Sequence, residues 1–413
     1  MKIRANRNLW LHPITLFATV WLLSLGLYAM HLSKLLIVDV SQVKRIVMWI
    51  VVPFVSTVVY VSLVCWMAPR RKVRTPLADG ESDAYFQGVE RALDRWFHVW
   101  VALTVVEIIF SRGVPILWLL THRSHNYTDY GLPFVHVFIG SLLAVIAMGK
   151  LTLFLLKGER RRLRLPIFQI IWGVIVVSRG LMMTALLQYL VLFLCIKGVN
   201  LKILFRTVVS TMLVIVMFGV LGNLRSGGAS AFRKLAQPTS NYPEWLPSGV
   251  LWFYIYLTSP LDNLGNTVKA QEPAYDIYFP RTTYFLYPTP IRHAIFGKDS
   301  NLGRDSNLVN RSLNVSSAYI GPYVDYGYIG IAAYSVLLGI LSALVWRMRR
   351  NIRGTILYAI MAQCLIFSVF YNYLFYNPFV GQIFWILLIF SPRALVIFSR
   401  TKPWIPSEST VTG

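Results

Sequence analysis

The chain has 413 residues, of which 56% are hydrophobic and only 14% are charged. Soluble domains carry about a quarter charged residues, whereas apolar runs of roughly 18 or more residues recur here, so the composition excludes an ordinary soluble enzyme and predicts an all-α polytopic membrane protein. The net charge of +23 does not predict a nucleic-acid partner, because basic cytoplasmic loops of a membrane protein account for it.

About ten transmembrane helices are predicted from the apolar runs. In chain order these runs cover about residues 12–31, 47–68, 97–111, 134–156, 167–177, 181–196, 207–221, 318–346, 356–375 and 379–397. An amphipathic helix from Asp83 to Trp96 precedes the third run, and the fifth and sixth form a predicted hairpin that turns at Ser178-Arg179-Gly180. Lys150, near the inner end of the fourth run, is expected to extend its ammonium group to the membrane surface.

One long polar segment, 222–317, separates the seventh and eighth spans. Its apolar patch, Gly249 to Leu257, is too short to cross a membrane and lies between Pro247 and Pro260, so we interpret it as interfacial. Basic residues crowd into alternate short loops, and such loops stay in the cytoplasm. The pattern therefore predicts cytoplasmic termini and one long extracytoplasmic loop.

This topology divides the chain into four parts. They are the N-terminal transmembrane helices (1–221), the large outer loop (222–317), the C-terminal transmembrane helices (318–398) and a cytoplasmic tail (399–413). The three cysteines lie in separate apolar runs and form neither a disulfide framework nor a metal-ligand pattern. We expect no metal and no cofactor.

Familiar catalytic motifs are absent from the sequence. It has no P-loop, no His-Glu-x-x-His, no Gly-x-Ser-x-Gly and no Asp-x-Asp. The cytoplasmic loops are also too short to hold a nucleotide-binding domain. If the protein is an enzyme, its substrate is therefore expected to be anchored in the membrane already and to carry its own leaving group.

Arginine is frequent in the long outer loop. The loop contains Arg225, Arg233, Arg281, Arg292, Arg304 and Arg311. The planar guanidinium group suits bidentate contacts with phosphate. Arg225 is the most suggestive, because backbone amides at Gly227 and Gly228 can approach an anion closely. Anchoring to lipid headgroups is the alternative interpretation.

Four ionisable residues lie at the outer ends of predicted spans: Glu107, Arg112, Arg179 and Asp325. Such groups are costly at membrane depth and usually face a polar cavity or each other. Glu107 is a candidate base, and a structural ion pair with Arg112 or Arg179 is its alternative role. Asp325 is either a catalytic base or an N-terminal helix cap.

An aromatic run from Tyr278 to Asp299 contains interleaved basic residues. Tyrosine rings suit stacking against the apolar faces of sugars, and Arg281 and Arg292 lie between them. His293 is a candidate general base, because the unperturbed pKa of histidine is about 6.5. A polar surface residue is the alternative interpretation of His293.

The stretch NVSSAYIGPYVDYGYIGIAAYSVLLGIL (314–341) resembles the signature of bacterial oligosaccharide repeat-unit polymerases, the Wzy-type O-antigen polymerases. It departs from that signature at Ser317, where threonine is usual, and at Asp325-Tyr326-Gly327, which replaces Asp-Phe-Gly. Shorter patches also agree, namely HPIT (12–15), VEIIFSRGVPIL (106–117), VVSRG (176–180) and GNLRSGG (222–228). The resemblance implies a GT-C-like helix bundle in the bacterial inner membrane with a periplasmic active site.

The resemblance also implies a reaction. Such polymerases are inverting, metal-independent glycosyltransferases that move a glycan from undecaprenyl diphosphate to another carrier-linked repeat unit. The implied diphosphate-binding residues are Arg225, Arg281 and Arg292, with Arg179 and Arg112 deeper; the base is Asp325, His293 or Glu107. Asn314, Tyr323, Tyr284 and Tyr287 are the expected sugar contacts. A chain-length regulator protein is an expected partner.

Two other functions fit the same sequence. An O-antigen ligase would use the same donor but transfer the glycan to lipid A-core, and His293 keeps this alternative open. A flippase or other transporter of lipid-linked oligosaccharides belongs to a different class. Transporters of that kind usually show internal repeats and polar residues near the midplane, whereas this chain shows no repeat and gathers its polar residues at the outer side.

Overall fold

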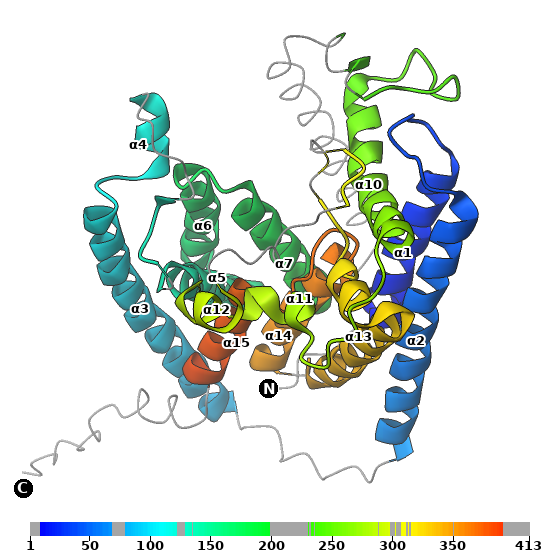
Figure 1. Cartoon of the computed structure of the whole chain (residues 1–413). Coiled ribbons are helices and arrows are strands. Elements are labelled where there is room, and N and C mark those ends of the chain that lie inside the picture. The colour runs from blue at the N-terminus through cyan, green and yellow to red at the C-terminus, as the bar shows by residue number, and fades with distance from the viewer. Residues whose placement is uncertain are drawn as a thin grey trace, which may run out of the picture.

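The computed structural model describes residues 9–67, 79–121, 129–133, 135–198, 236–287, 289–297, 315–349 and 351–390, with residues 230, 233–234, 302, 307–310 and 313. Across these residues the protein is helical and contains no β-strand; an isolated bridge joins Ser33 and Pro238. Figure 1 shows the helices as one assembly in which segments far apart in the sequence lie side by side. The predicted all-α fold is confirmed.

The longer helices are α1 (Pro13–Ala29), α2 (Val40–Met67), α3 (Asp79–Phe110), α5 (Val135–Lys157), α6 (Arg164–Ile175), α7 (Arg179–Lys197), α10 (Ser248–Ala270), α13 (Ile320–Met348), α14 (Ile352–Phe367) and α15 (Asn377–Ile389). Shorter helices are α4 (Pro115–Leu120), α11 (Pro280–Thr283) and α12 (Thr289–Phe296). Single 3-10 turns are η1 (Leu9–Leu11), η3 (Arg160–Leu163) and η4 (Tyr284–Leu286).

Five helical segments are long and apolar enough to cross a membrane: Val40–Met67, Tyr85–Leu120, Val135–Lys157, Gly180–Lys197 and Ile320–Met348. Three further apolar helices, α1, α14 and α15, are shorter. These helices make the chain an α-helical membrane protein by length and composition. The predicted seventh span, 207–221, lies outside the described residues, so the count of ten remains a prediction.

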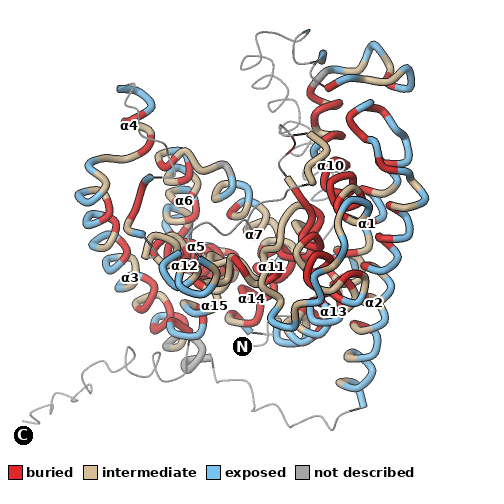
Figure 2. The backbone as a smooth tube through the Cα atoms, in the orientation of Figure 1, coloured by how far each residue is buried: buried red, intermediate tan, exposed pale blue. Residues whose placement is uncertain are grey.

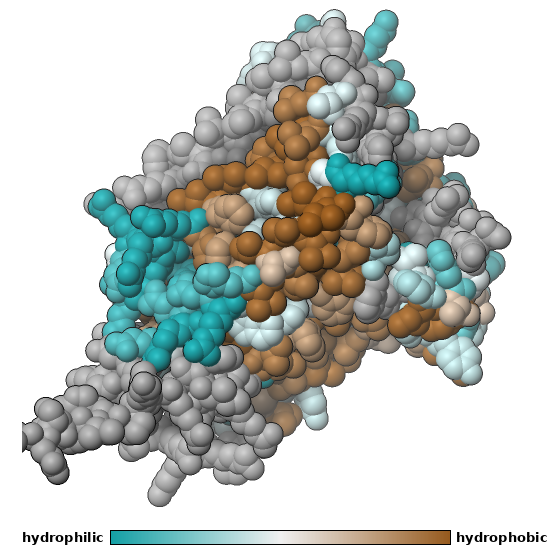
Figure 3. All heavy atoms as spheres, turned by 90° about the vertical axis from the view of Figure 1, so that its left-hand side faces the viewer, coloured by the Kyte–Doolittle hydropathy of each residue, from teal (hydrophilic) through white to brown (hydrophobic). Residues whose placement is uncertain are grey.

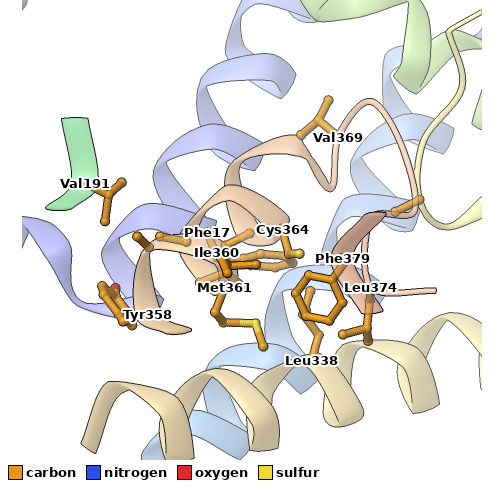
Figure 4. Packing of buried hydrophobic residues seen from close by; sticks show 14 of the residues in the cluster. Phe17, Val191, Leu338, Tyr358, Ile360, Met361, Cys364, Val369, Leu374 and Phe379 are labelled. Atoms are coloured by element: carbon orange, nitrogen blue, oxygen red, sulfur yellow. The ribbon is translucent and has the colours of Figure 1, made fainter. Parts of the chain in front are cut away.

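Helix α5 is the most enclosed of the five long apolar segments, with 83% of its most apolar window buried. Helices α3, α6, α7 and α15 pack around it, while α13 packs against α2 and α14 (Figure 2). A small residue permits one of these contacts: a Cβ added at Gly149 would lie 2.9 Å from the Leu93 side chain of α3. The tight core between α1, α13 and α14 contains Phe17, Leu338 and Ile360 (Figure 4).

The outer faces of α3 and α6 are apolar. Their exposed residues include Val105 and Ile109 on α3 and Ile167 and Ile171 on α6, each at least 49% exposed. Figure 3 shows this side of the molecule as a broad hydrophobic surface with a hydrophilic patch beside it. A surface of this kind suits contact with lipid chains rather than with water.

Two expectations about the N-terminal half are corrected. The amphipathic segment and the third span are one continuous helix, α3. Lys150 does not extend to the membrane surface: its side chain is buried, and its ammonium nitrogen lies 2.6 Å from Asp94 and 3.5 Å from Glu90. Two carboxylates of α3 hold the charge inside the bundle, so the prediction from the position of Lys150 along its own helix was wrong.

The expected length of the apolar patch Gly249 to Leu257 is also corrected, whereas its interfacial position stays a prediction. Pro247 precedes α10, but Pro260 lies inside it, and the helix continues to Ala270. Leu251, Ile255 and Leu261 are buried against protein. Helix α10 is held against α1 and the α1–α2 loop by Asp262, which accepts hydrogen bonds from the Tyr28 hydroxyl (2.5 Å) and the Val38 amide (2.9 Å). Burial raises the pKa of this carboxyl.

Helix α13 is interrupted at the Asp-Tyr-Gly sequence. Tyr326 and Gly327 leave helical geometry, and Gly327 has a φ of +61°. Glycine adopts that left-handed conformation without the steric cost that a side chain would bring. The interruption places Asp325 at the end of a first short helical segment, where its carboxylate is directed to α11 rather than along its own helix.

Candidate functional site

A cavity of about 460 Å³ lies where the outer loop meets the bundle, and we call it the Arg281 cavity. Its lining comes from α11 and η4, from the start of α13, from the α14–α15 loop and from the described part of the 302–308 segment. The lining residues are Arg281, Thr282, Phe285, Leu302, Leu308, Ser316, Ser317, Ala318, Ile320, Gly321, Tyr371, Asn372 and Phe375.

The loop between α14 and α15 is tied to the other walls of this cavity. The span expected to continue to residue 375 ends as a helix at Phe367. Asn372 then donates a hydrogen bond to the Thr282 carbonyl at 3.0 Å and accepts one from the Tyr334 hydroxyl at 2.8 Å. At the start of α13, the Ala318 amide donates to the Ser368 carbonyl at 3.0 Å. These contacts fix a polar wall inside an otherwise apolar bundle.

Asp325 supports the cavity from behind. Its carboxylate, on a residue only 1% exposed, accepts from the Arg281 amide (3.0 Å), the Thr282 amide (2.7 Å) and the Thr282 hydroxyl (2.6 Å). The residue that precedes α11, Phe279, supplies no side-chain acceptor. Asp325 therefore caps α11 from another helix. This geometry favours the capping role that the sequence left open, although the capped helix is α11 and not α13.

Arg292 meets the aromatic residues that were expected to contact sugar. Its guanidinium lies 4.7 Å from the centre of the Tyr284 ring, a cation–π contact. Tyr284 and Tyr287 each pack against Phe296, with ring centres 5.6 and 5.8 Å apart. His293 lies on the same helix, α12, and is half-buried. The structure therefore brings Arg292, Tyr284 and Tyr287 close together, and their rings and guanidinium group pack within this cluster.

Tyr323 is placed differently from the prediction. It is buried, and its hydroxyl donates to the Val268 carbonyl at 3.1 Å, so it belongs to the packing between α13 and α10. Nothing in this position leaves its ring available to a sugar. Arg225 and Asn314 lie outside the described residues, as does the side chain of Arg179.

A second cavity, of about 270 Å³, lies between α5, α6, α7, α14 and α15, and we call it the His136 cavity. It is lined by His136, Val137, Gly140, Ser141, Ala144, Gln169, Ser178, Gly180, Leu181, Thr184, Gln363, Tyr373, Tyr376, Pro378, Phe379 and Gln382. Both cavities border the α14–α15 loop: Tyr371 and Asn372 line the first, and Tyr373 and Tyr376 line the second.

Glu107 reaches this second cavity through a histidine. Its carboxylate lies 3.1 Å from Nδ1 of His136 and accepts a hydrogen bond from the Leu132 amide at 3.2 Å. Among the described side chains, Glu107 therefore pairs with His136 and not with Arg112; the side chain of Arg179 is outside the described residues. Arg112 is exposed at the end of α3, in a left-handed conformation with a φ of +54°.

The Glu107–His136 pair is suited to acid–base chemistry. Glu107 is 1% exposed, whereas the His136 side chain is 41% exposed. A carboxylate that accepts from Nδ1–H fixes the tautomer in which Nε2 has a free lone pair. Nε2 can then accept a proton from a ligand hydroxyl. The sequence analysis missed His136, which lies among apolar residues; its only signal was a histidine in the first turn of a predicted span.

The fold and these cavities define an α-helical membrane protein with two polar cavities at one loop. Comparison of the chain with models of protein families, with curated proteins and with solved structures finds no match in any of the three.

Proposed function

We propose that the protein polymerises undecaprenyl-diphosphate-linked oligosaccharide repeat units of an O-antigen or related polysaccharide. It is an inverting, metal-independent glycosyltransferase of the bacterial inner membrane that acts on the periplasmic side. The support comes from the resemblance of residues 314–341 to the repeat-unit polymerases and from the position of that stretch in the structure. Ser316, Ser317 and Gly321 of the stretch line the Arg281 cavity together with Arg281.

The presence of Arg281 in that cavity is the observation that carries the proposal. Arginine binds a diphosphate in bidentate fashion and stabilises the charge that develops as it leaves. The start of α13, with the positive end of its helix dipole, borders the same space. Arg225, Arg292, Arg112 and Arg179 remain predictions for the diphosphate; Arg292 and Arg112 do not line this cavity.

Of the three groups considered as the base, Glu107 is the best placed, but it acts by orienting His136, and His136 is the group that takes the proton. The acceptor hydroxyl gives its proton to His136, and its oxygen forms the new bond to the anomeric carbon of the donor. The bond from that carbon to the diphosphate breaks, and the diphosphate leaves with the electron pair. Asp325 already accepts three hydrogen bonds and is enclosed, which favours a structural role for it.

The test is complementation of a deletion strain, read as the chain-length ladder of its polysaccharide on a gel. Deletion should leave one capped repeat unit. The Arg281→Ala variant should reproduce that loss at normal protein level, because the Asp325 contact uses the backbone amide of residue 281 and survives the substitution. Arg161→Ala, at an exposed position in η3, is the control and should restore the full ladder.

Other outcomes separate the alternatives. Carrier-linked chains that never reach the lipid A-core would indicate a ligase, and lipid-linked units that accumulate in the cytoplasm would indicate a flippase. A normal ladder from Arg281→Ala would remove Arg281 from the diphosphate site. A normal ladder from the deletion strain would overturn the polymerase assignment itself.

A further inference from the structure

The described lining of the His136 cavity is rich in polar groups. Among the lining residues that the structure describes are no Asp, Glu, Lys or Arg, and His136 is the one histidine; the side chain of Arg179, next to Ser178 and Gly180, lies outside the described residues. Hydroxyl or carboxamide groups come from Ser141, Ser178, Thr184, Gln169, Gln363, Gln382, Tyr373 and Tyr376. A ligand that fits these described groups exchanges many hydrogen bonds.

Three glutamines on separate helices organise this lining. The Gln188 amide group, on α7, donates to the carboxamide oxygens of Gln363 on α14 (2.5 Å) and Gln382 on α15 (3.0 Å). Both acceptors line the cavity, and their NH₂ groups have no hydrogen-bond partner within the described part of the chain. Both NH₂ groups are therefore available to donate to a molecule that enters the cavity.

His136 adds an acceptor to these donors. Glu107 engages Nδ1 at 3.1 Å, and Tyr130 packs edge-on against the imidazole at 5.3 Å, so the ring has a fixed orientation. The remaining nitrogen, Nε2, is the acceptor in that tautomer. Donors from two glutamines and an acceptor from one histidine match the hydroxyl groups of a polyol, each of which donates and accepts.

Aromatic rings complete the lining. Tyr373, Tyr376 and Phe379 border the cavity, and the first two rings are perpendicular with centres 5.9 Å apart. A sugar ring presents apolar C–H faces as well as hydroxyls, so it can use aromatic walls and amide groups together. Pockets of this kind combine apolar surface with a few placed polar groups.

From these contacts we infer that the His136 cavity is a binding site for a sugar. The sugar's hydroxyls contact His136, Gln363 and Gln382, and its C–H face contacts the aromatic wall. Assigning this sugar to the acceptor end of a repeat unit rests on the proposed function; the site itself rests only on the cavity. Glu107 is a positioning residue, since it acts through His136.

The test measures protection of His136 from a histidine-modifying reagent. Purified full-length protein in nanodiscs is treated with diethyl pyrocarbonate, and modification is followed by peptide mass spectrometry. The probe is the repeat-unit oligosaccharide obtained by partial acid hydrolysis of the native strain's surface polysaccharide. We expect the probe to slow modification of His136 severalfold and to leave that of His293, on α12, unchanged. Equal rates with and without the probe would overturn the proposal, as would a His136 that never reacts.

Substitutions in the cavity lining test whether protection of His136 comes from a molecule bound in the His136 cavity. Gln382→Leu removes one of the two amide donors and should abolish protection, while Gln87→Leu, at an exposed position on α3, should keep it. Gln363→Met is the second cavity variant, used if Gln382→Leu does not give a monodisperse protein. Protection that persists in the folded cavity variants would overturn the site.

The protection test of the sugar site and the deletion-strain test of the polymerase can fail independently of each other. A deletion strain that still makes long polymer, together with protection of His136 in the purified protein, overturns the polymerase assignment and keeps the sugar site. Loss of long polymer in the deletion strain, together with no protection, overturns the sugar site and keeps the polymerase.

Discussion

Asp325 and Thr282 are 43 positions apart in the chain, yet the carboxylate of one accepts both the amide and the hydroxyl of the other, at 2.7 and 2.6 Å. This contact holds α11 against α13 and so fixes the position of Arg281 at the cavity wall. It also explains why an aspartate is tolerated in an apolar stretch: backbone donors of α11 satisfy it.

Asp325→Ala should destabilise the protein strongly. It leaves two buried amides and a hydroxyl without an acceptor, and each unsatisfied buried group costs about 1–3 kcal/mol. Thr282→Val removes only the hydroxyl contact and should cost less. Thermal unfolding followed by fluorescence-detected size exclusion checks the order. Equal midpoints for both variants and the wild type would show that the cap contributes nothing.

The Asp325→Asn variant distinguishes capping from catalysis. The amide of asparagine keeps one acceptor oxygen, so it can still cap α11 in part. If Asp325 is a cap, the amount of long polymer should fall only in proportion to the amount of folded protein. A catalytic base would behave differently, with full loss of polymer at an unchanged protein level and an unchanged unfolding midpoint. The measurement is the ladder normalised to folded protein.

Gly131→Ala should disrupt the Glu107–His136 pair. Gly131 has a φ of +101°, and an added Cβ would lie 2.5 Å from the His136 ring. Gly140→Ala is the matched control on the same cavity, because nothing lies within 4 Å of a Cβ there. We expect Gly131→Ala to shorten the polymer and to change the rate at which His136 is modified. Identical behaviour of the two variants would contradict the placement of the 129–133 segment over His136.

Two neighbouring arginines should differ in their contribution to stability. Arg162 is buried and donates to Glu90 at 3.0 and 2.9 Å, whereas Arg161 pairs with Glu159 and its side chain is 71% exposed. Arg162→Gln removes the guanidinium from the mostly buried Glu90, which then keeps, among the described side chains, only Lys150 at 3.5 Å as a charged partner. An exposed pair contributes only about 0–1 kcal/mol. Arg162→Gln should therefore lower the unfolding midpoint far more than Arg161→Gln.

The predicted topology can be checked with single cysteines. Cys65 is replaced by serine first, because Cys195 and Cys364 are buried and should not react. Lys34→Cys, in the α1–α2 loop, should then react with a membrane-impermeant maleimide in intact spheroplasts. Arg160→Cys, in the α5–α6 connection, should react only after the membrane is opened. The opposite pattern would reverse the orientation and place the long loop in the cytoplasm.

Much of the helical fold was predictable from local sequence, because a bilayer requires apolar residues in runs long enough to cross it. The runs predicted α1, α5 and α13 close to their observed bounds, whereas α2 begins at Val40 and not near residue 47. Ser178 was recognised at the α6–α7 hairpin, where it accepts from the Leu181 amide. Local sequence was less reliable where a proline lies inside a helix. Pro260 appeared to end a short patch, but the packing of α10 against α1 and α13 carries the helix past it.

For the candidate site, the sequence determined which residues are chemically able to act: arginines in the outer loop, Glu107 and Asp325 near the membrane boundary, and tyrosines between them. Only the tertiary structure decided their partners. Glu107 meets His136, 29 positions away, Lys150 meets α3, and Asp325 meets α11. The physical reason is that a buried charge or hydrogen-bonding group must be satisfied, and in a helix bundle its partner usually lies on another helix, at a distance along the chain that no local pattern records.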